Sequence, residues 1–170
     1  MRRLLTPLFA MVAVMLVSCG YQLVGHGESA GAIPADVKTL SLIVRGSSDR
    51  RLDPMLRQRL KSDRYALIDE QDVIDQAAHA KLRVNISQLL FRPSAYDAAG
   101  VETEYRMVFA GSLLIERQGK AIWQSGLISA DGDVYVAGGP ASIEASRERL
   151  YNDLRKQWLQ DALGRLRSGF

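Results

Sequence analysis

The clearest pattern in this chain is the alternation of apolar and polar residues with a period of two, which is typical of half-buried strands. Strand candidates showing it are residues 38–44, 81–90, 104–117 and 122–136, with a further brief candidate at residues 65–68. The two long segments are separated by Gly119, and Gly126 interrupts the second. We therefore expect residues 104–136 to form a long hairpin that turns at Gly119 and has a bulge near Gly126.

Two other segments repeat their apolar residues at helical spacing. The first contains Leu52, Leu56 and Leu60, and we expect it to begin with Asp53 as N-cap and Pro54 as the first helical residue. The second begins near Ser142 and carries an apolar stripe to the end of the chain.

Strands and helices do not alternate regularly, which predicts an α+β fold: two helices packed on one face of a roughly four-stranded mixed sheet. The opposite sheet face would then be free to bind a partner.

The N-terminus has the order of a bacterial lipoprotein signal peptide. Basic Arg2 and Arg3 precede about 14 mostly apolar residues, fewer than the roughly 20 needed to span a bilayer. Residues 16–19 read Leu-Val-Ser-Cys, which resembles a lipobox. We expect residues 1–18 to be removed and Cys19 to carry S-diacylglycerol and N-palmitoyl groups. The chain then divides into the signal peptide, a lipidated N-terminus with a flexible tether (19–36) and a single α+β domain (37–170).

The residue after the lipidated cysteine predicts the destination. Gly20 stands where an aspartate would favour retention in the inner membrane of enteric-type bacteria. By this resemblance the protein is expected at the cell outer membrane, lipid-anchored on its periplasmic side. Several acyl chains anchor a protein almost permanently, because each buried methylene contributes about 0.8 kcal/mol.

Charge and cysteine content narrow the functional class. Loss of Arg2 and Arg3 would reduce the basic residues from 22 to 20, against 19 acidic residues. The mature domain is therefore nearly neutral, and we expect no nucleic-acid partner. Cys19 is the only cysteine, so no disulfide can form within the chain.

The chain lacks the residue patterns that usually signal catalysis or metal binding. His26 and His79 have no ligands at metal-binding spacing, and we expect both to be surface residues. A Gly-x-Ser-x-Gly motif is absent around Ser47, Ser48, Ser87, Ser94 and Ser112. Asp131 and Asp133 fit a solvated bend. We therefore expect no catalytic residues, no metal and no cofactor.

Basic residues recur along the predicted strands and their turns. The candidates for binding a phosphorylated glycolipid are Arg92, Arg106, Arg117 and Lys120, together with Arg83. Their significance depends on whether they cluster at one end of the sheet. The alternative is a set of solvated residues balanced by Glu102, Glu104 and Glu116.

Two short motifs and the final amphipathic helix give the chain a family resemblance. Residues 19–25 read Cys-Gly-Tyr-Gln-Leu-Val-Gly, and residues 100–105 read Gly-Val-Glu-Thr-Glu-Tyr. In order and spacing these resemble the LPS-assembly lipoprotein LptE family, with Val24 where the family often has arginine.

The resemblance implies a non-enzymatic part of the lipopolysaccharide transport machinery. Such a protein plugs the lumen of the LptD outer-membrane β-barrel, assists its assembly and is a candidate to bind lipopolysaccharide. Two alternatives stay open: a periplasm-facing lipoprotein adaptor of another envelope transport complex, and a membrane-anchored hydrolase, which would need a nucleophile with an oriented base.

Overall fold

The computed structural model describes residues 31–46, 49–61, 65–136 and 140–170. The predictions for the signal peptide and for lipidation at Cys19 lie outside these residues. No helix of the described part is long and apolar enough to cross a membrane.

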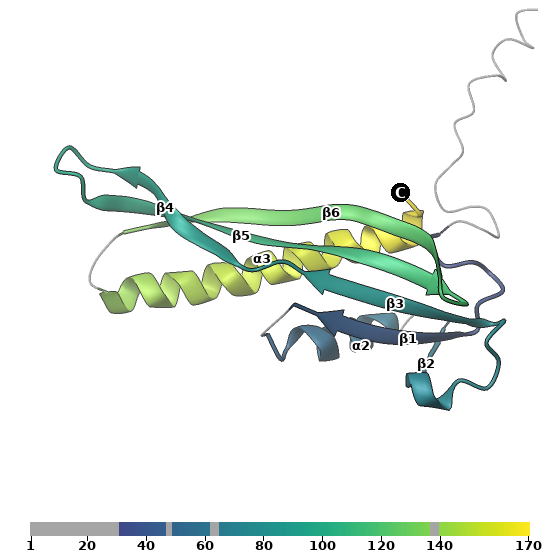
Figure 1. Ribbon diagram of the computed structural model, residues 1–170. Coiled ribbons are helices and arrows are strands. Elements are labelled where there is room, and N and C mark those ends of the chain that lie inside the picture. Colours follow the sequence, from purple (N-terminus) through teal and green to yellow (C-terminus); the bar gives the residue numbers. More distant parts are fainter. Residues whose placement is uncertain (1–30, 47–48, 62–64, 137–139) are drawn as a thin grey trace, which may run out of the picture.

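The described chain folds as a curled mixed sheet of six strands with two helices (Figure 1). Its elements, in chain order, are β1 (Thr39–Arg45), α2 (Leu52–Leu60), β2 (Ala66–Leu67), a 3-10 turn η1 (Glu70–Asp72), β3 (His79–Ile86), β4 (Leu90–Tyr96), β5 (Glu102–Arg117), β6 (Lys120–Tyr135) and α3 (Pro140–Ser168). Strand β1 is parallel to β2 and β3, while β5 is antiparallel to β3, β4 and β6. The α+β class is confirmed, but the expected number of about four strands is wrong.

The predicted long hairpin is present. Strands β5 and β6 have 16 residues each and pair along their whole length. Gln118 and Gly119 form the turn with φ values of 51° and 75°, the positive values that two-residue hairpin turns require. Gly126 has a φ of 67°, and the register shifts between Ser112 and Leu114 opposite it, which confirms the expected bulge.

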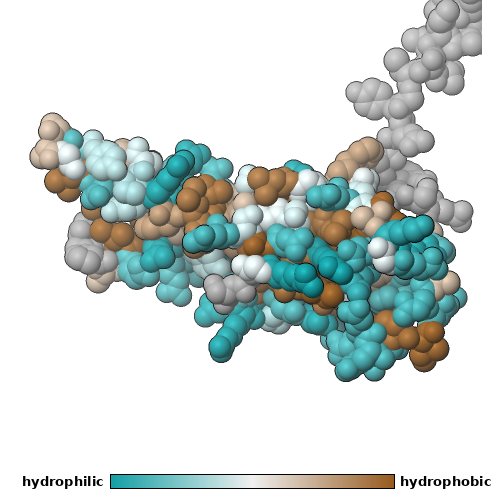
Figure 2. Space-filling model, viewed as in Figure 1, coloured by the Kyte–Doolittle hydropathy of each residue, from teal (hydrophilic) through white to brown (hydrophobic). Residues whose placement is uncertain are grey.

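Strands β3 and β4 share one edge of β5, and this arrangement was missed. The expected strand at residues 81–90 ends at Ile86, and a separate strand begins at Leu90. Strand β3 pairs with residues 111–116 of β5, and β4 pairs with residues 102–108. The β4–β5 hairpin projects beyond the helix-covered core (Figure 1), and hydrophobic side chains occur on this projecting end as well as at the opposite end of the molecule (Figure 2).

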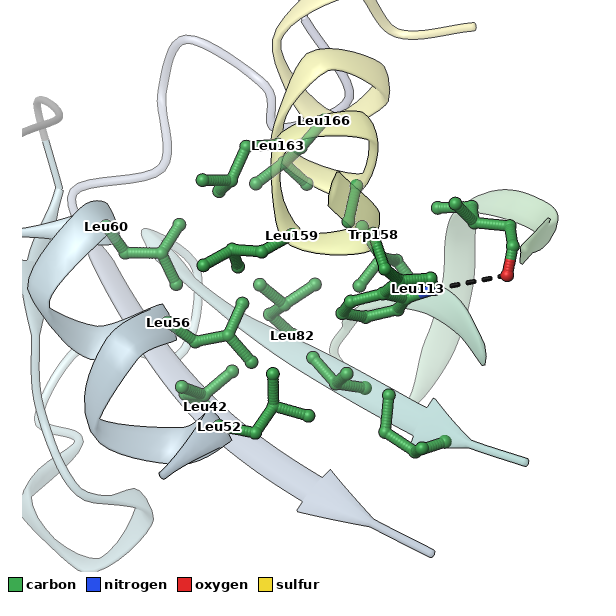
Figure 3. Close-up of a cluster of buried hydrophobic side chains, with 14 of the residues drawn as sticks. Leu42, Leu52, Leu56, Leu60, Leu82, Leu113, Trp158, Leu159, Leu163 and Leu166 are labelled. Atoms are coloured by element: carbon green, nitrogen blue, oxygen red, sulfur yellow. Dashed lines mark hydrogen bonds between the residues drawn. The ribbon is translucent and has the colours of Figure 1, made fainter. Parts of the chain in front are cut away.

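Both helices pack on the same face of the sheet, as expected. Leucines of α2 and of α3 meet alternate residues of β1, β3 and β5 in one buried cluster (Figure 3). Trp158 at its centre is fully buried, packs edge-on against Phe109 at 5.6 Å and donates its indole N–H to the Ile128 carbonyl at 3.1 Å. Each buried leucine contributes roughly 1.5–3 kcal/mol, so this core holds α2, α3 and the sheet together.

Two local expectations need correction. Helix α2 begins at Leu52, so its N-cap is Arg51 and not Asp53. The helix starts two residues earlier than expected and includes the fully buried Leu52, and Asp53 instead pairs with Arg57 at 2.6 Å. Residues 31–36 were expected to belong to the tether, but they are part of the packed structure. Ile33 is buried, and the Ala32 amide donates to the Leu166 carbonyl at 2.9 Å.

Candidate functional site

The sheet face opposite the helices, which we call the outer face, carries one pair of the predicted basic residues. Arg92 of β4 lies directly opposite Arg106 of β5 in the strand register, so the two side chains are neighbours on this face. Arg117 and Lys120 flank the turn at the far end of the β5–β6 hairpin. Eleven strand residues separate Arg106 from Arg117, which is about 36 Å at roughly 3.3 Å per residue. The predicted residues therefore form two sites and not one cluster.

Arg106 is held by carboxylates of the neighbouring strand. It forms an ion pair with Asp131, and Asp133 lies directly opposite it in the register. The hydrogen bond that Arg106 donates to Asp131 raises the pKa of Arg106, with further contributions from the charges of Asp131, Asp133 and Glu104. Both side chains of the pair are about half exposed, so an incoming anion can compete with Asp131 in water.

Arg92 differs from Arg106 because it has no ion-pair partner among the described residues. Leu90 stands beside it in β4 and lies opposite Val108 of β5, and Leu90 is partly exposed. An amphiphile with an anionic headgroup needs a cation for the headgroup and an apolar surface for its chain, and a guanidinium next to an apolar strip provides both. This combination makes the Arg92 region the best candidate for ligand binding on the outer face.

The second basic site is largely neutralised by its own neighbours. Arg117 binds both carboxylate oxygens of Asp36, at 3.1 and 2.5 Å, and also donates to the Ala77 carbonyl. The hydrogen bond between them lowers the pKa of Asp36 and raises that of Arg117.

Beside this site, Lys81 pairs with Glu70, and Arg83 lies 2.9 Å from Glu116. These four side chains line a pocket of about 310 Å³ with Gln118 and Gly119. Lys120 has no ion-pair partner among the described residues. It is therefore the cation of the second site that is most available to a ligand.

His79 is a buried residue, so its expected place on the surface is wrong. Its imidazole lies within hydrogen-bond distance of two hydroxyls, 3.0 Å from Thr39 Oγ1 and 3.2 Å from Ser41 Oγ. Burial lowers the pKa of His79, aided by the charge of Lys81. Ser41 is only 2% exposed, and the groups described at the ring are hydroxyls and not a carboxylate that would orient the imidazole as a base.

A buried ion pair joins the middle of α3 to the loop before α2. Arg155 and Asp49 meet at 2.5 Å, with side chains 6% and 9% exposed. Tyr151 also donates to Asp49 at 3.1 Å, and Arg155 donates to Asn152 at 2.8 Å. Burial raises the pKa of Asp49, but the hydrogen bonds from Arg155, the Arg51 amide and Tyr151 outweigh it, and the net pKa lies below the ordinary value.

This network was not predictable from the sequence, because nothing local links residue 49 to residue 155. The signal available was an arginine at residue 155, immediately after the apolar-stripe residue Leu154. Asp49 and Tyr151 line a hollow of about 350 Å³ with Arg147, whose guanidinium lies 4.9 Å from the Phe91 ring centroid. The described residues contain no group of three or more His, Cys, Asp or Glu side chains that could hold a metal ion.

Comparison with known proteins gives likeness at the level of the fold. No protein-family model matches the chain, and no curated protein sequence matches it. Among solved structures, rare lipoprotein B from Shewanella oneidensis aligns with a TM-score of 0.58 at 19% identity, covering 75% of this chain and 92% of that one.

Two further lipoproteins align similarly. Lipoprotein B from Nitrosomonas europaea has a TM-score of 0.60 at 12% identity, covering 87% of this chain and 90% of that one. A minor lipoprotein from Acinetobacter baumannii has a TM-score of 0.57 at 15% identity, covering 78% and 92%. The chain therefore has the fold of these bacterial lipoproteins over nearly their whole length.

Proposed function

We propose that this protein is a non-enzymatic outer-membrane lipoprotein of the lipopolysaccharide transport machinery, a plug and assembly partner of the LptD β-barrel. The observation that carries the proposal is the shared fold with three bacterial lipoproteins, each covered over at least 90% of its length. The N-terminal sequence agrees with this, because Cys19 follows an apolar segment of signal-peptide length. Its acyl chains would hold the domain on the periplasmic side of the membrane.

The surface of the domain suits the interior of a large barrel. The lumen of an outer-membrane barrel is polar, so a plug must present hydrogen-bonding and charged groups on opposite sides. Arg106, Asp131 and Asp133 do so on the outer face, and Asp153 and Lys156 do so on the solvent side of α3. The apolar side chains of both helices are meanwhile buried in one core.

Lipopolysaccharide is the proposed ligand of the outer face. Phosphates of its lipid A would bind Arg92 and displace Asp131 from Arg106, while an acyl chain would lie along Leu90 and Val108. Lys120 and Arg117 would form a separate contact at the opposite end of the β5 strand. Arg117 would bind lipopolysaccharide more weakly than Lys120, because Arg117 already forms an ion pair with Asp36. The domain would then have two basic binding sites for lipopolysaccharide, about 36 Å apart along one strand.

Affinity purification of the tagged protein from detergent-solubilised outer membranes tests the proposal. We expect a very large β-barrel to co-purify in about a one-to-one ratio, identified by mass. Recovery of an inner-membrane transporter or a peptidoglycan factor in place of a barrel would overturn the plug and support the adaptor of another envelope complex.

A further inference from the structure

The chain enters the domain at one end, and the β4–β5 hairpin projects from the other end (Figure 1). Residue 31, the first described residue, packs against the last turn of α3: the neighbouring Ala32 amide bonds to Leu166, and Gly169 lies against Gly31. The β4–β5 hairpin projects at the opposite end (Figure 1). Helix α3 alone spans about 43 Å at 1.5 Å per residue, so the chain enters the domain far from the projecting hairpin.

The end where the chain enters carries exposed apolar side chains that the fold does not use. Phe170 is 80% exposed and Leu127 is 66% exposed, and both line an open hollow of about 660 Å³ between β6 and the end of α3. Trp123 lies beside them, because its indole donates to the Gly169 carbonyl at 2.9 Å. We call Trp123, Leu127, Arg165 and Phe170 the C-terminal face.

Basic residues accompany this apolar group. Arg165 lines the hollow and is fixed there by a hydrogen bond of 2.7 Å to the Ser125 carbonyl. Asp161 also lines the hollow, and Lys120 begins β6, the strand that carries Trp123 and Leu127. Exposed aromatic and aliphatic groups beside basic side chains are characteristic of protein surfaces that rest on phospholipid headgroups.

The length of chain before residue 31 limits where this face can lie. If Cys19 is lipidated, twelve residue steps link it to residue 31, and they span at most about 40 Å when fully extended. The end of the domain that the tether enters is thus restricted to the neighbourhood of the leaflet, whereas the projecting hairpin lies a further helix length away.

We propose that the C-terminal face is a membrane-contact surface that rests on the phospholipid headgroups of the leaflet holding Cys19. Leu127 and Phe170 insert between headgroups, and Arg165 binds lipid phosphates. In the complex with a barrel, this face lies at the periplasmic mouth and sets the direction in which the hairpin enters the lumen. The inference rests on the proposed lipid anchor at Cys19, but it does not require the barrel.

Tryptophan quenching by brominated phospholipids tests this contact with the lipidated full chain in vesicles. The protein has two tryptophans, and Trp158 is fully buried. We expect bromine on the acyl chains to quench the wild type clearly more than the Trp123→Phe variant, which retains only Trp158. As a reporter at the other end, Tyr135→Trp in the Trp123→Phe background should show less than half of the quenching seen at Trp123.

Substitutions at the face complete the test. Leu127→Ser combined with Phe170→Ser should reduce quenching of Trp123 at least twofold, while the matched pair Tyr96→Ser and Val101→Ser at the projecting hairpin should leave it unchanged. Equal quenching at both ends, or stronger quenching at Tyr135→Trp, would overturn the inference. The mass of the N-terminal peptide separates the two proposals: an acylated Cys19 with an unquenched Trp123 overturns the contact alone, and an unacylated Cys19 overturns both.

Discussion

The buried pair of Arg155 and Asp49 gives a prediction whose size follows from the structure. Arg155→Ala leaves the Asp49 carboxylate 9% exposed, with its charge no longer balanced by the guanidinium at 2.5 Å. The Tyr151 hydroxyl and the Arg51 amide would still donate hydrogen bonds to it, but neither carries a positive charge. Removing one member of a buried pair typically costs 3–5 kcal/mol, so we expect a loss of about that size in the free energy of unfolding.

Equilibrium urea unfolding measures this loss, with circular dichroism following the helices and the fluorescence of Trp123 and Trp158 following the packing around them. The double replacement Asp49→Leu with Arg155→Met removes both charges, so we expect it to be at least about 2 kcal/mol more stable than Arg155→Ala. A matched control is Lys156→Ala, which removes an exposed pair with Asp153 and should cost under about 1 kcal/mol. If Arg155→Ala lowers the free energy of unfolding no more than Lys156→Ala does, the buried pair does not stabilise the fold as proposed.

Three further predictions concern the same residues and the proposed function. Cys19→Ala should accumulate as an unacylated precursor of higher mass, and acylated mature protein from that variant, detected by mass spectrometry, would contradict the anchor. Arg92→Ala combined with Arg106→Ala should weaken lipopolysaccharide binding by the purified protein about tenfold or more, because hydrogen bonds to charged groups contribute roughly 1.5–3 kcal/mol each. The control Arg149→Ala on α3 should leave the affinity unchanged. Equal affinities of the double variant and the wild type in titration calorimetry would contradict this binding site. Because the pKa of Asp49 is lower in the folded protein, its stabilisation is complete above the ordinary aspartate value and is lost as pH falls through the folded pKa. Acid unfolding below about pH 4 should therefore be less steep in Asp49→Asn than in the wild type.

The long-range pattern of the fold was predictable because its elements are long and periodic. The β5–β6 hairpin alternates over many residues, and the turn at Gly119 requires a backbone conformation that glycine adopts readily. The stripe of α3 likewise repeats over eight turns of helix, so a single error in position does not hide it.

Short and exposed elements were not predictable in the same way. Strand β4 alternates only between exposed and half-buried positions and contains Pro93, so it lacks the apolar signal of a core strand. Strand β2 was predicted as the brief candidate at residues 65–68, but it has only two residues and pairs with β1 alone, a partner that the local pattern did not indicate. The burial of His79 depends on Thr39 and Ser41, about forty residues away.

The candidate site shows the same limit. Basic residues were identifiable as types, but their grouping depends on strand register: it sets Arg92 beside Arg106 and leaves Arg117 at the far end. Whether a charge is available also depends on folded partners. Arg117 is paired with Asp36, and the two residues are 81 positions apart in the sequence, so no local pattern indicates the pairing.

Photo-crosslinking in living cells would show whether a barrel surrounds the domain. Asp133 lies on the outer face of the sheet, and Asp153 lies on the solvent side of α3, so the two exposed positions point in opposite directions. With a photoreactive residue placed at each in turn, we expect both to crosslink to the same large outer-membrane barrel. A barrel crosslink from only one of the two positions, or from neither, would contradict a plug enclosed in the lumen.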